Sequence, residues 1–227
     1  MKKYVNLFVF VFMIGACLSQ GRAQTKSAVS YKNPVVDIAM PDPTVIKAAD
    51  GYFYVYATES TRNVPIMKSK DLVQWTYCNT AFTNKTRPRF EPKAGIWAPD
   101  INYINGKYVL YYAMSVWGGE QTCGIGVATA DSPQGPFTDH GKMFRSNEIG
   151  VQNSIDPSLL QYEGRNYLVW GSFRGIYVIE LTADGLSIMS GAKKKRIAGT
   201  AFEAVYIHKH DDYYYMFASI GSCCQGV

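Results

Sequence analysis

Four acidic residues recur at the start of similar segments of this chain. Asp42 and Asp156 each precede a proline, Asp100 follows Pro99, and Glu203 opens the last segment. A single Asp-Pro is usually a turn device, because Asp accepts local backbone N–H bonds and Pro fixes φ. Carboxyls that recur in phase can converge, and crowding raises the pKa of at least one of them. A neutral acid beside an ionised base is what glycoside hydrolysis requires.

The segments that carry these acids form an internal repeat. Each acid is followed by an apolar stretch, a tight turn and a second stretch rich in Tyr, Val and Phe, over residues 51–58, 106–113, 164–171 and 211–218. The acids lie 58, 56 and 47 residues apart along the chain. A period near fifty residues of short, turn-punctuated strands is typical of a β-propeller, so the predicted fold class is all-β.

Further strands complete each repeat. Residues 64–72 with Trp75, residues 125–133 with Phe137, and residues 176–181 with Leu186 each read as strand, turn and outer strand. The sequence therefore predicts four-stranded blades that begin near Asp42, Trp97 and Ile155, and the inner hairpin of another blade from Phe202. Lys193 to Arg196 is predicted to be a solvated loop.

About three and a half blades are expected in residues 24–227, which we interpret as the N-terminal part of a longer propeller domain. A shorter, complete all-β architecture is the alternative. An unclosed ring exposes an apolar sheet edge, so we expect residues 24–227 expressed alone to be poorly soluble or inactive. The full-length protein is expected to be a monomer.

Composition limits the classes of partner. The chain is 47% hydrophobic, 14% aromatic and 18% charged, which excludes a disordered tail and a coiled coil. No Lys/Arg cluster alternates with aromatic residues, so nucleic-acid binding is not expected. Flat aromatic rings suit the apolar faces of sugars, and Trp97 and Trp117 flank the second acidic segment.

The first residues read as an export signal. Lys2 and Lys3 precede an apolar run over residues 5–18, and small residues prepare a cleavage after Ala23. We predict a signal peptide over residues 1–23 and a secreted or periplasmic protein. The alternative is a lipoprotein anchored through Cys17, the only route by which membrane association is expected. Removal of residues 1–23 lowers the net charge from +5 to +2.

Four cysteines remain after this cleavage. They allow three full disulfide pairings, among which the sequence does not choose, and their spacing matches no zinc motif. An exported protein meets an oxidising compartment, so these residues are interpreted as structural. They are Cys78, Cys123, Cys223 and Cys224.

Six sequence motifs follow one another along residues 33–227. They are Met40-Pro-Asp-Pro-Thr-Val-Ile, Trp97-Ala-Pro-Asp-Ile, Asn153-Ser-Ile-Asp-Pro-Ser, Trp170-Gly-Ser-Phe, Phe202-Glu-Ala-Val-Tyr-Ile and Cys223-Cys-Gln-Gly. In order and spacing they resemble glycoside hydrolase family 43, and within it they look most like the arabinan endo-1,5-α-L-arabinosidases (arabinanases).

This resemblance implies a five-bladed propeller and an inverting hydrolase of α-1,5-linked arabinofuranosyl bonds in arabinan. By motif, Asp42 would be the general base, Glu203 the general acid, and Asp156 the group that tunes the pKa of the acid and orients it. Inversion needs the base and acid carboxyls roughly 6.5–9.5 Å apart. The same resemblance implies sugar stacking on Trp97 and Trp117, and sugar hydrogen bonds from Asn153 and Ser172.

The chain departs from the family pattern at two points. Val205 replaces a proline that arabinanases usually carry in the acid motif. A later histidine that helps these enzymes hold calcium has no counterpart here, so the resemblance leaves a structural calcium open without an assignable ligand. His208 and His210 are interpreted as solvent-facing turn residues. No cofactor is required for the predicted chemistry.

Two other functions remain open from the sequence. An exo-acting α-L-arabinofuranosidase or a β-xylosidase of the same family would use the same acids. A non-catalytic glycan-binding propeller would keep the tryptophans and use the acids only as structural groups.

Overall fold

Short strands joined by tight turns make up most of the described chain. The computed structural model describes residues 30–222, so the predicted signal peptide, Cys17, Cys223 and Cys224 lie outside the described residues. The elements are β1 (Thr44–Lys47), β2 (Phe53–Tyr56), β3 (Pro65–Ser69), β4 (Trp75–Thr80), β5 (Gly95–Ile104), β6 (Lys107–Ser115), β7 (Gly124–Ala130), β8 (Thr138–Arg145), α1 (Ser146–Ile149), β9 (Ser158–Tyr162), β10 (Arg165–Trp170), β11 (Ile176–Glu180), β12 (Lys195–Ala198), β13 (Phe202–His210) and β14 (Tyr213–Ile220).

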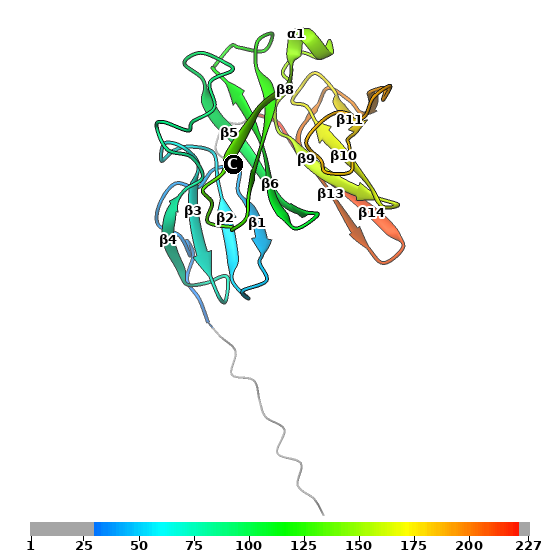
Figure 1. Ribbon diagram of the computed structural model, residues 1–227. Coiled ribbons are helices and arrows are strands. Elements are labelled where there is room, and N and C mark those ends of the chain that lie inside the picture. The colour runs from blue at the N-terminus through cyan, green and yellow to red at the C-terminus, as the bar shows by residue number, and fades with distance from the viewer. Residues whose placement is uncertain (1–29, 223–227) are drawn as a thin grey trace, which may run out of the picture. The chain divides into compact units, whose positions relative to one another are not determined.

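The strands form antiparallel sheets in chain order. The first sheet is β1–β4, the second is β5–β8, the third is β9–β12, and β13 pairs with β14 in a hairpin. In Figure 1 they follow one another as cyan, green, yellow and orange-red ribbons. The predicted all-β class and the four-stranded sheets are thereby confirmed.

The first strands of successive sheets lie next to one another. β1 contacts β5, β5 contacts β9, and β9 contacts β13. Propeller blades meet around their axis in this way, with the inner strand of each blade beside that of the next. The number of blades in the complete ring stays a prediction.

Consecutive side chains of β6 fill two different cores. Tyr112 lies between the first and second sheets, where its ring centroid is 5.7 Å from that of Phe82. Tyr111 points the other way, into a core with Phe144 and Trp170, whose ring centroids are 5.1 Å apart. Because side chains alternate along a strand, one β-branched and aromatic strand holds both neighbouring sheets in place.

The outer strand of the third sheet differs from the prediction. It is β12, formed by Lys195 to Ala198, whereas Leu186 lies in a loop that makes only an isolated bridge between Leu181 and Ile188. The basic run predicted to be a loop therefore supplies an edge strand in part. Charged side chains are common on edge strands because they discourage pairing with other chains. Such a strand lacks the hydrophobic pattern from which strands are predicted.

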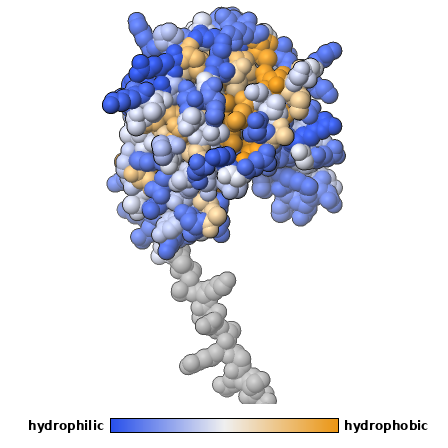
Figure 2. Space-filling model, viewed as in Figure 1, coloured by the Kyte–Doolittle hydropathy of each residue, from blue (hydrophilic) through white to orange (hydrophobic). Residues whose placement is uncertain are grey.

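Most of the molecular face in view is hydrophilic, and apolar side chains gather in a band near its middle (Figure 2). No helix among residues 30–222 is both long and apolar enough to span a membrane.

A buried ion pair links the first two sheets. The carboxylate of Glu59, after β2, is bridged by Arg87, and their side chains are 9% and 6% exposed. Glu59 also accepts bonds from the backbone N–H groups of Asn63 (2.8 Å) and Ile96 (2.9 Å). Burial opposes ionisation, but these donors outweigh it and lower the pKa of Glu59.

Replacing Arg87 with methionine is expected to lower the free energy of unfolding by about 3–5 kcal/mol, because Glu59 would remain buried without its counter-ion. Urea unfolding measures this loss. Lys107→Met is the control, since Lys107 pairs with Asp131 in solvent and should change stability much less. Equal losses for the two variants would contradict the prediction.

Candidate functional site

Three of the predicted acids come together from separate sheets. Asp42 precedes β1, Asp156 precedes β9, and Glu203 lies in β13. Burial, followed by the charges of Glu203 and Asp42, raises the pKa of Asp156 to about 7. Asp42 is exposed, while Asp156 and Glu203 are half-buried. The arrangement couples one solvent-facing carboxyl with two carboxyls deeper in the fold.

A left-handed backbone position recurs near the head of each inner strand, just before β1 and β9 and within the first residues of β5 and β13. Asp42 has φ 48°, Ala98 has φ 41°, Asp156 has φ 56° and Ala204 has φ 51°. Pro43, Pro99, Pro157 and Val205 follow them. Non-glycine residues are uncommon at positive φ, and Asp is among the types enriched there. Asp42 and Asp156 therefore occupy equivalent positions, while Glu203 lies one residue before Ala204, the left-handed residue of its hairpin.

Bulges at two of these positions redirect side chains. The register shifts between Trp97 and Asp100 in β5, and between Glu203 and Tyr206 in β13. A bulge opposes two residues to one and often re-aims a side chain near a functional site. Trp97 directly precedes the left-handed residue of the second sheet, and Glu203 directly precedes that of the hairpin, so the two residues occupy equivalent positions.

Asp100 has a different place from the one its sequence position suggested. It is 9% exposed and accepts bonds from the backbone N–H of Leu159 (2.8 Å) and the side-chain amide of Asn102 (2.7 Å). Desolvation raises the pKa of Asp100 to about 6, against the effect of these donors. Because Leu159 belongs to β9, Asp100 joins the second and third sheets rather than the cluster of Asp42, Asp156 and Glu203.

Glu203 is held from the end of β10. The Ser172 hydroxyl donates to Glu203 Oε2 at 3.1 Å, and the two residues form a backbone bridge. The N–H of Phe173 donates to the carbonyl of Phe202 at 2.9 Å. Ser172 is only 2% exposed, so its hydroxyl lies behind the acid. Its expected contact with sugar stays a prediction.

A buried hydroxyl network supports the segment that precedes β9. Ser154 accepts a bond from the indole N–H of Trp170 (3.1 Å), and its own hydroxyl donates to the carbonyl of Val151 (2.8 Å). Its N–H donates to the Ser146 hydroxyl at 2.9 Å. Asp156 in turn accepts a bond from the N–H of Ala204 at 3.2 Å, which ties the third sheet to the hairpin.

Trp97 and Trp117 form an aromatic pair. Their ring centroids are 5.5 Å apart at 52°, and Trp117 is 79% exposed. Trp97 is half-buried and packs against a small cluster that contains Ile155, next to Asp156 in sequence. An exposed indole over a half-buried one presents an apolar surface suited to a sugar ring.

The segment that bears Trp117 is tied to the third sheet. Glu120 pairs with Arg174 at 2.8 Å, and its carbonyl accepts the N–H of Asn153 at 2.8 Å. The side-chain amide of Asn153 donates to the carbonyl of Ser172 at 3.1 Å. Asn153 thus lies between the aromatic pair and the residue that holds Glu203, and it is partly exposed.

Sequence reasoning missed two residues at this site. The Thr58 hydroxyl contacts Asp42, and Glu59 anchors the start of β5. Thr58 ends the predicted 51–58 strand and Glu59 follows it, so in a hairpin both would lie beside the Asp42 head of the same blade. This position is the feature of the sequence that could have indicated them. Their partners are 16 to 40 residues away in sequence, so pattern alone does not identify them.

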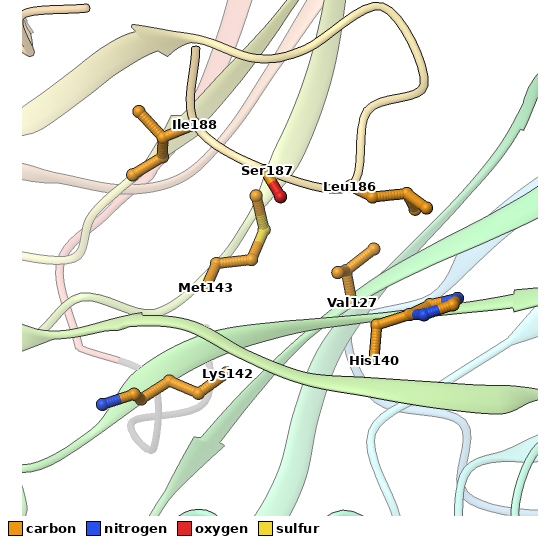
Figure 3. Close-up of a pocket in the computed structure, with 7 residues that line it drawn as sticks. All are labelled: Val127, His140, Lys142, Met143, Leu186, Ser187 and Ile188. Carbon is orange, nitrogen blue, oxygen red and sulfur yellow. The ribbon is translucent and has the colours of Figure 1, made fainter. Parts of the chain in front are cut away.

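A separate cavity of about 280 Å³ lies between β7–β8 and the 186–188 loop. Figure 3 shows its lining, which includes His140, Lys142 and Met143, with none of the predicted site residues.

Within residues 30–222, no group of three or more His, Cys, Asp or Glu side chains is arranged to hold a metal ion, so no ligands are assigned. His208 and His210 are exposed, as expected, although they lie in β13 rather than in a turn. Cys78 and Cys123 are free thiols.

Comparisons with known proteins identify the family and the fold. Residues 31–227 match the profile of glycosyl hydrolases family 43. An extracellular endo-α-(1→5)-L-arabinanase from Bacillus subtilis is 36% identical over 199 residues, which are 82% of this chain and 61% of the relative. The chain thus spans about three fifths of the length of this curated relative.

Two solved structures share the fold. The α-L-arabinanase of Cellvibrio cellulosa in complex with arabinohexaose has a TM-score of 0.72 at 28% identity, covering 83% of this chain and 67% of that one. An exo-1,5-α-L-arabinanase from a bovine ruminal metagenomic library has a TM-score of 0.72 at 30% identity, covering 87% and 70%. From the profile match and the shared fold, we conclude that the chain belongs to glycosyl hydrolases family 43.

Proposed function

We propose that the protein hydrolyses α-1,5-linked L-arabinofuranosyl bonds in arabinan. The observation that carries the proposal is the convergence of three carboxyls from different sheets: Asp156 accepts the N–H of Ala204, next to Glu203, and burial and then the charges of Glu203 and Asp42 raise its pKa. The aromatic pair of Trp97 and Trp117 supports a sugar substrate. The names of the relatives given above describe them as arabinanases, enzymes that act on this class of polymer.

Each acid has a proposed role. Asp42 is exposed and takes a proton from the attacking water, while Glu203, held by Ser172, donates a proton to the departing oxygen. Asp156 accepts the N–H of Ala204, next to Glu203, and so orients the acid. A water between base and sugar gives inversion, and the first-formed product, observed by NMR, is expected to have the opposite anomeric configuration to the substrate.

Endo action is the first candidate, since the Bacillus subtilis relative is named an endo-arabinanase. Exo action is the second candidate, because a structure named as an exo-1,5-α-L-arabinanase has the same TM-score as the Cellvibrio cellulosa enzyme.

Product sizes from debranched arabinan test the function and separate the two modes. An endo enzyme releases a ladder of oligosaccharides early in the reaction, whereas an exo enzyme releases a single small product from the start. Linear β-1,4-xylan is the control polymer. Hydrolysis of xylan but not of arabinan would contradict the proposal, as would glycan binding without hydrolysis of either.

The remaining proposals follow the family resemblance. We propose a five-bladed ring, of which residues 24–227 are the N-terminal part, and export directed by residues 1–23. The extracellular relative supports export.

A further inference from the structure

Thr58 lies directly beside the proposed base. Its Oγ1 is 2.5 Å from Asp42 Oδ2, and its N–H donates to the carbonyl of Pro41 at 2.9 Å. Both the side chain and the backbone of Thr58 thus contact the segment that carries Asp42. Within the described part of the chain, the other carboxylate oxygen of Asp42 makes no hydrogen bond.

The direction of the Thr58 proton is fixed by a neighbour in the second sheet. The N–H of Ala98 donates to Thr58 Oγ1 at 2.7 Å. A hydroxyl has one proton and two lone pairs, so with Ala98 occupying a lone pair the proton is directed to Asp42. Ala98 is the left-handed residue at the head of the second sheet, which makes this contact a link between two blade heads.

The backbone at Thr58 is anchored by the next residue. The N–H of Glu59 donates to the carbonyl of Ile96 at 3.1 Å, and its carboxylate receives the N–H of Ile96 and the Arg87 guanidinium. Glu59 therefore pairs with β5 through both its backbone and its side chain, so that Thr58 has little freedom to turn away from Asp42.

We propose that Thr58 is a positioning residue for Asp42, which orients the carboxylate so that its second oxygen faces the attacking water. The inference rests on the proposed function of Asp42 as general base. Hydrogen bonds to charged groups are stronger than neutral ones. Because Asp42 is proposed to act on the attacking water and not to bind the sugar, loss of this contact is expected to affect turnover more than substrate binding.

Two substitutions at Thr58 separate hydrogen bonding from packing. Thr58→Val keeps the shape and removes the hydroxyl, whereas Thr58→Ser keeps the hydroxyl and removes the methyl group. In the full-length protein we expect Thr58→Val to lower kcat on debranched arabinan by about 10- to 100-fold with little change in KM. Thr58→Ser should stay within about threefold of the unmodified protein. If Thr58→Val fails to fold, Thr58→Ala replaces it, because the site is partly open to solvent.

A double-mutant cycle tests whether Thr58 acts through Asp42. In an Asp42→Ala background, Thr58→Val should cause no further loss of the residual rate, because the group that it orients is gone. A merely structural role would give the same loss in both backgrounds.

The outcomes distinguish this inference from the proposed function. Without arabinan hydrolysis by the unmodified protein, the proposed function is overturned and the inference with it. An active protein that tolerates Thr58→Val, or that loses more activity with Thr58→Ser than with Thr58→Val, overturns the inference alone.

Discussion

Replacing Glu203 with glutamine is expected to lower kcat for arabinan hydrolysis by about 10²- to 10⁴-fold, the usual contribution of a general acid. Glutamine has the same size and can still accept the bond from the Ser172 hydroxyl, but its amide N–H protons are not acidic enough to be transferred to the departing oxygen. Binding of arabino-oligosaccharides, measured by calorimetry, should change little, because the aromatic pair is untouched.

The leaving group provides an internal test of this role. An aryl arabinofuranoside with a strongly acidic phenol needs little protonation as it departs, so Glu203→Gln should retain far more of its rate on this substrate than on arabinan. Glu163→Gln is the matched control, since Glu163 is exposed in the turn between β9 and β10. Unchanged arabinan hydrolysis by Glu203→Gln would remove this residue from the mechanism.

The sheets could be predicted because local chemistry specifies them. Turn residues separate stretches of Tyr, Val and Phe at a regular period, and each stretch pairs with its neighbour in sequence. The exception is β12, whose Lys195 and Arg196 lie on an edge where burial does not select for apolar residues. Hydrophobic patterning finds strands that pack on both sides more readily than strands that face solvent.

The equivalence of the strand heads could be predicted only in part. Aligning the acids paired Asp100 with Asp42, whereas the left-handed backbone positions pair Ala98 with Asp42. Pro43, Pro99 and Pro157 each follow the left-handed residue, so an alignment on the prolines would have matched Ala98 to Asp42. The bulge between Trp97 and Asp100 changes which side chains of β5 face the same way. Such a bulge depends on pairing with β6, which residue types alone do not reveal.

The hydrogen-bond partners of the acids were beyond sequence reasoning. The family resemblance implies a sugar contact for Ser172, which stays a prediction, but no sequence pattern indicated that its hydroxyl donates to Glu203. Thr58 and Ala98 are 40 residues apart and meet only once two sheets are side by side. Contacts of this kind depend on tertiary packing and carry no periodic signal.

Replacing Asp156 with asparagine is expected to stabilise the protein at high pH and to lower its activity. The folded protein holds a proton on Asp156 up to about pH 7, whereas the unfolded chain loses it near pH 4. The folded state binds more protons between these values, so the free energy of unfolding falls as pH rises through this window. Asparagine removes that slope and can still accept the bond from the N–H of Ala204.

At about pH 8 the variant should be more stable than the unmodified protein by on the order of 2 kcal/mol, a value reduced for the partial exposure of this site. At about pH 4.5 the two should be nearly equal, and urea unfolding at both values measures the difference. Asp131→Asn is the control, because Asp131 is exposed, pairs with Lys107 in solvent and should contribute little to stability. Because Asp156 is proposed to orient Glu203, Asp156→Asn should also displace that acid and lower kcat by roughly 10²-fold. The same carboxyl is expected to destabilise the fold at high pH and to serve the proposed reaction. A gain of stability without a loss of activity would therefore separate Asp156 from catalysis. No gain of stability at high pH would contradict the raised pKa of Asp156 beside Glu203 and Asp42.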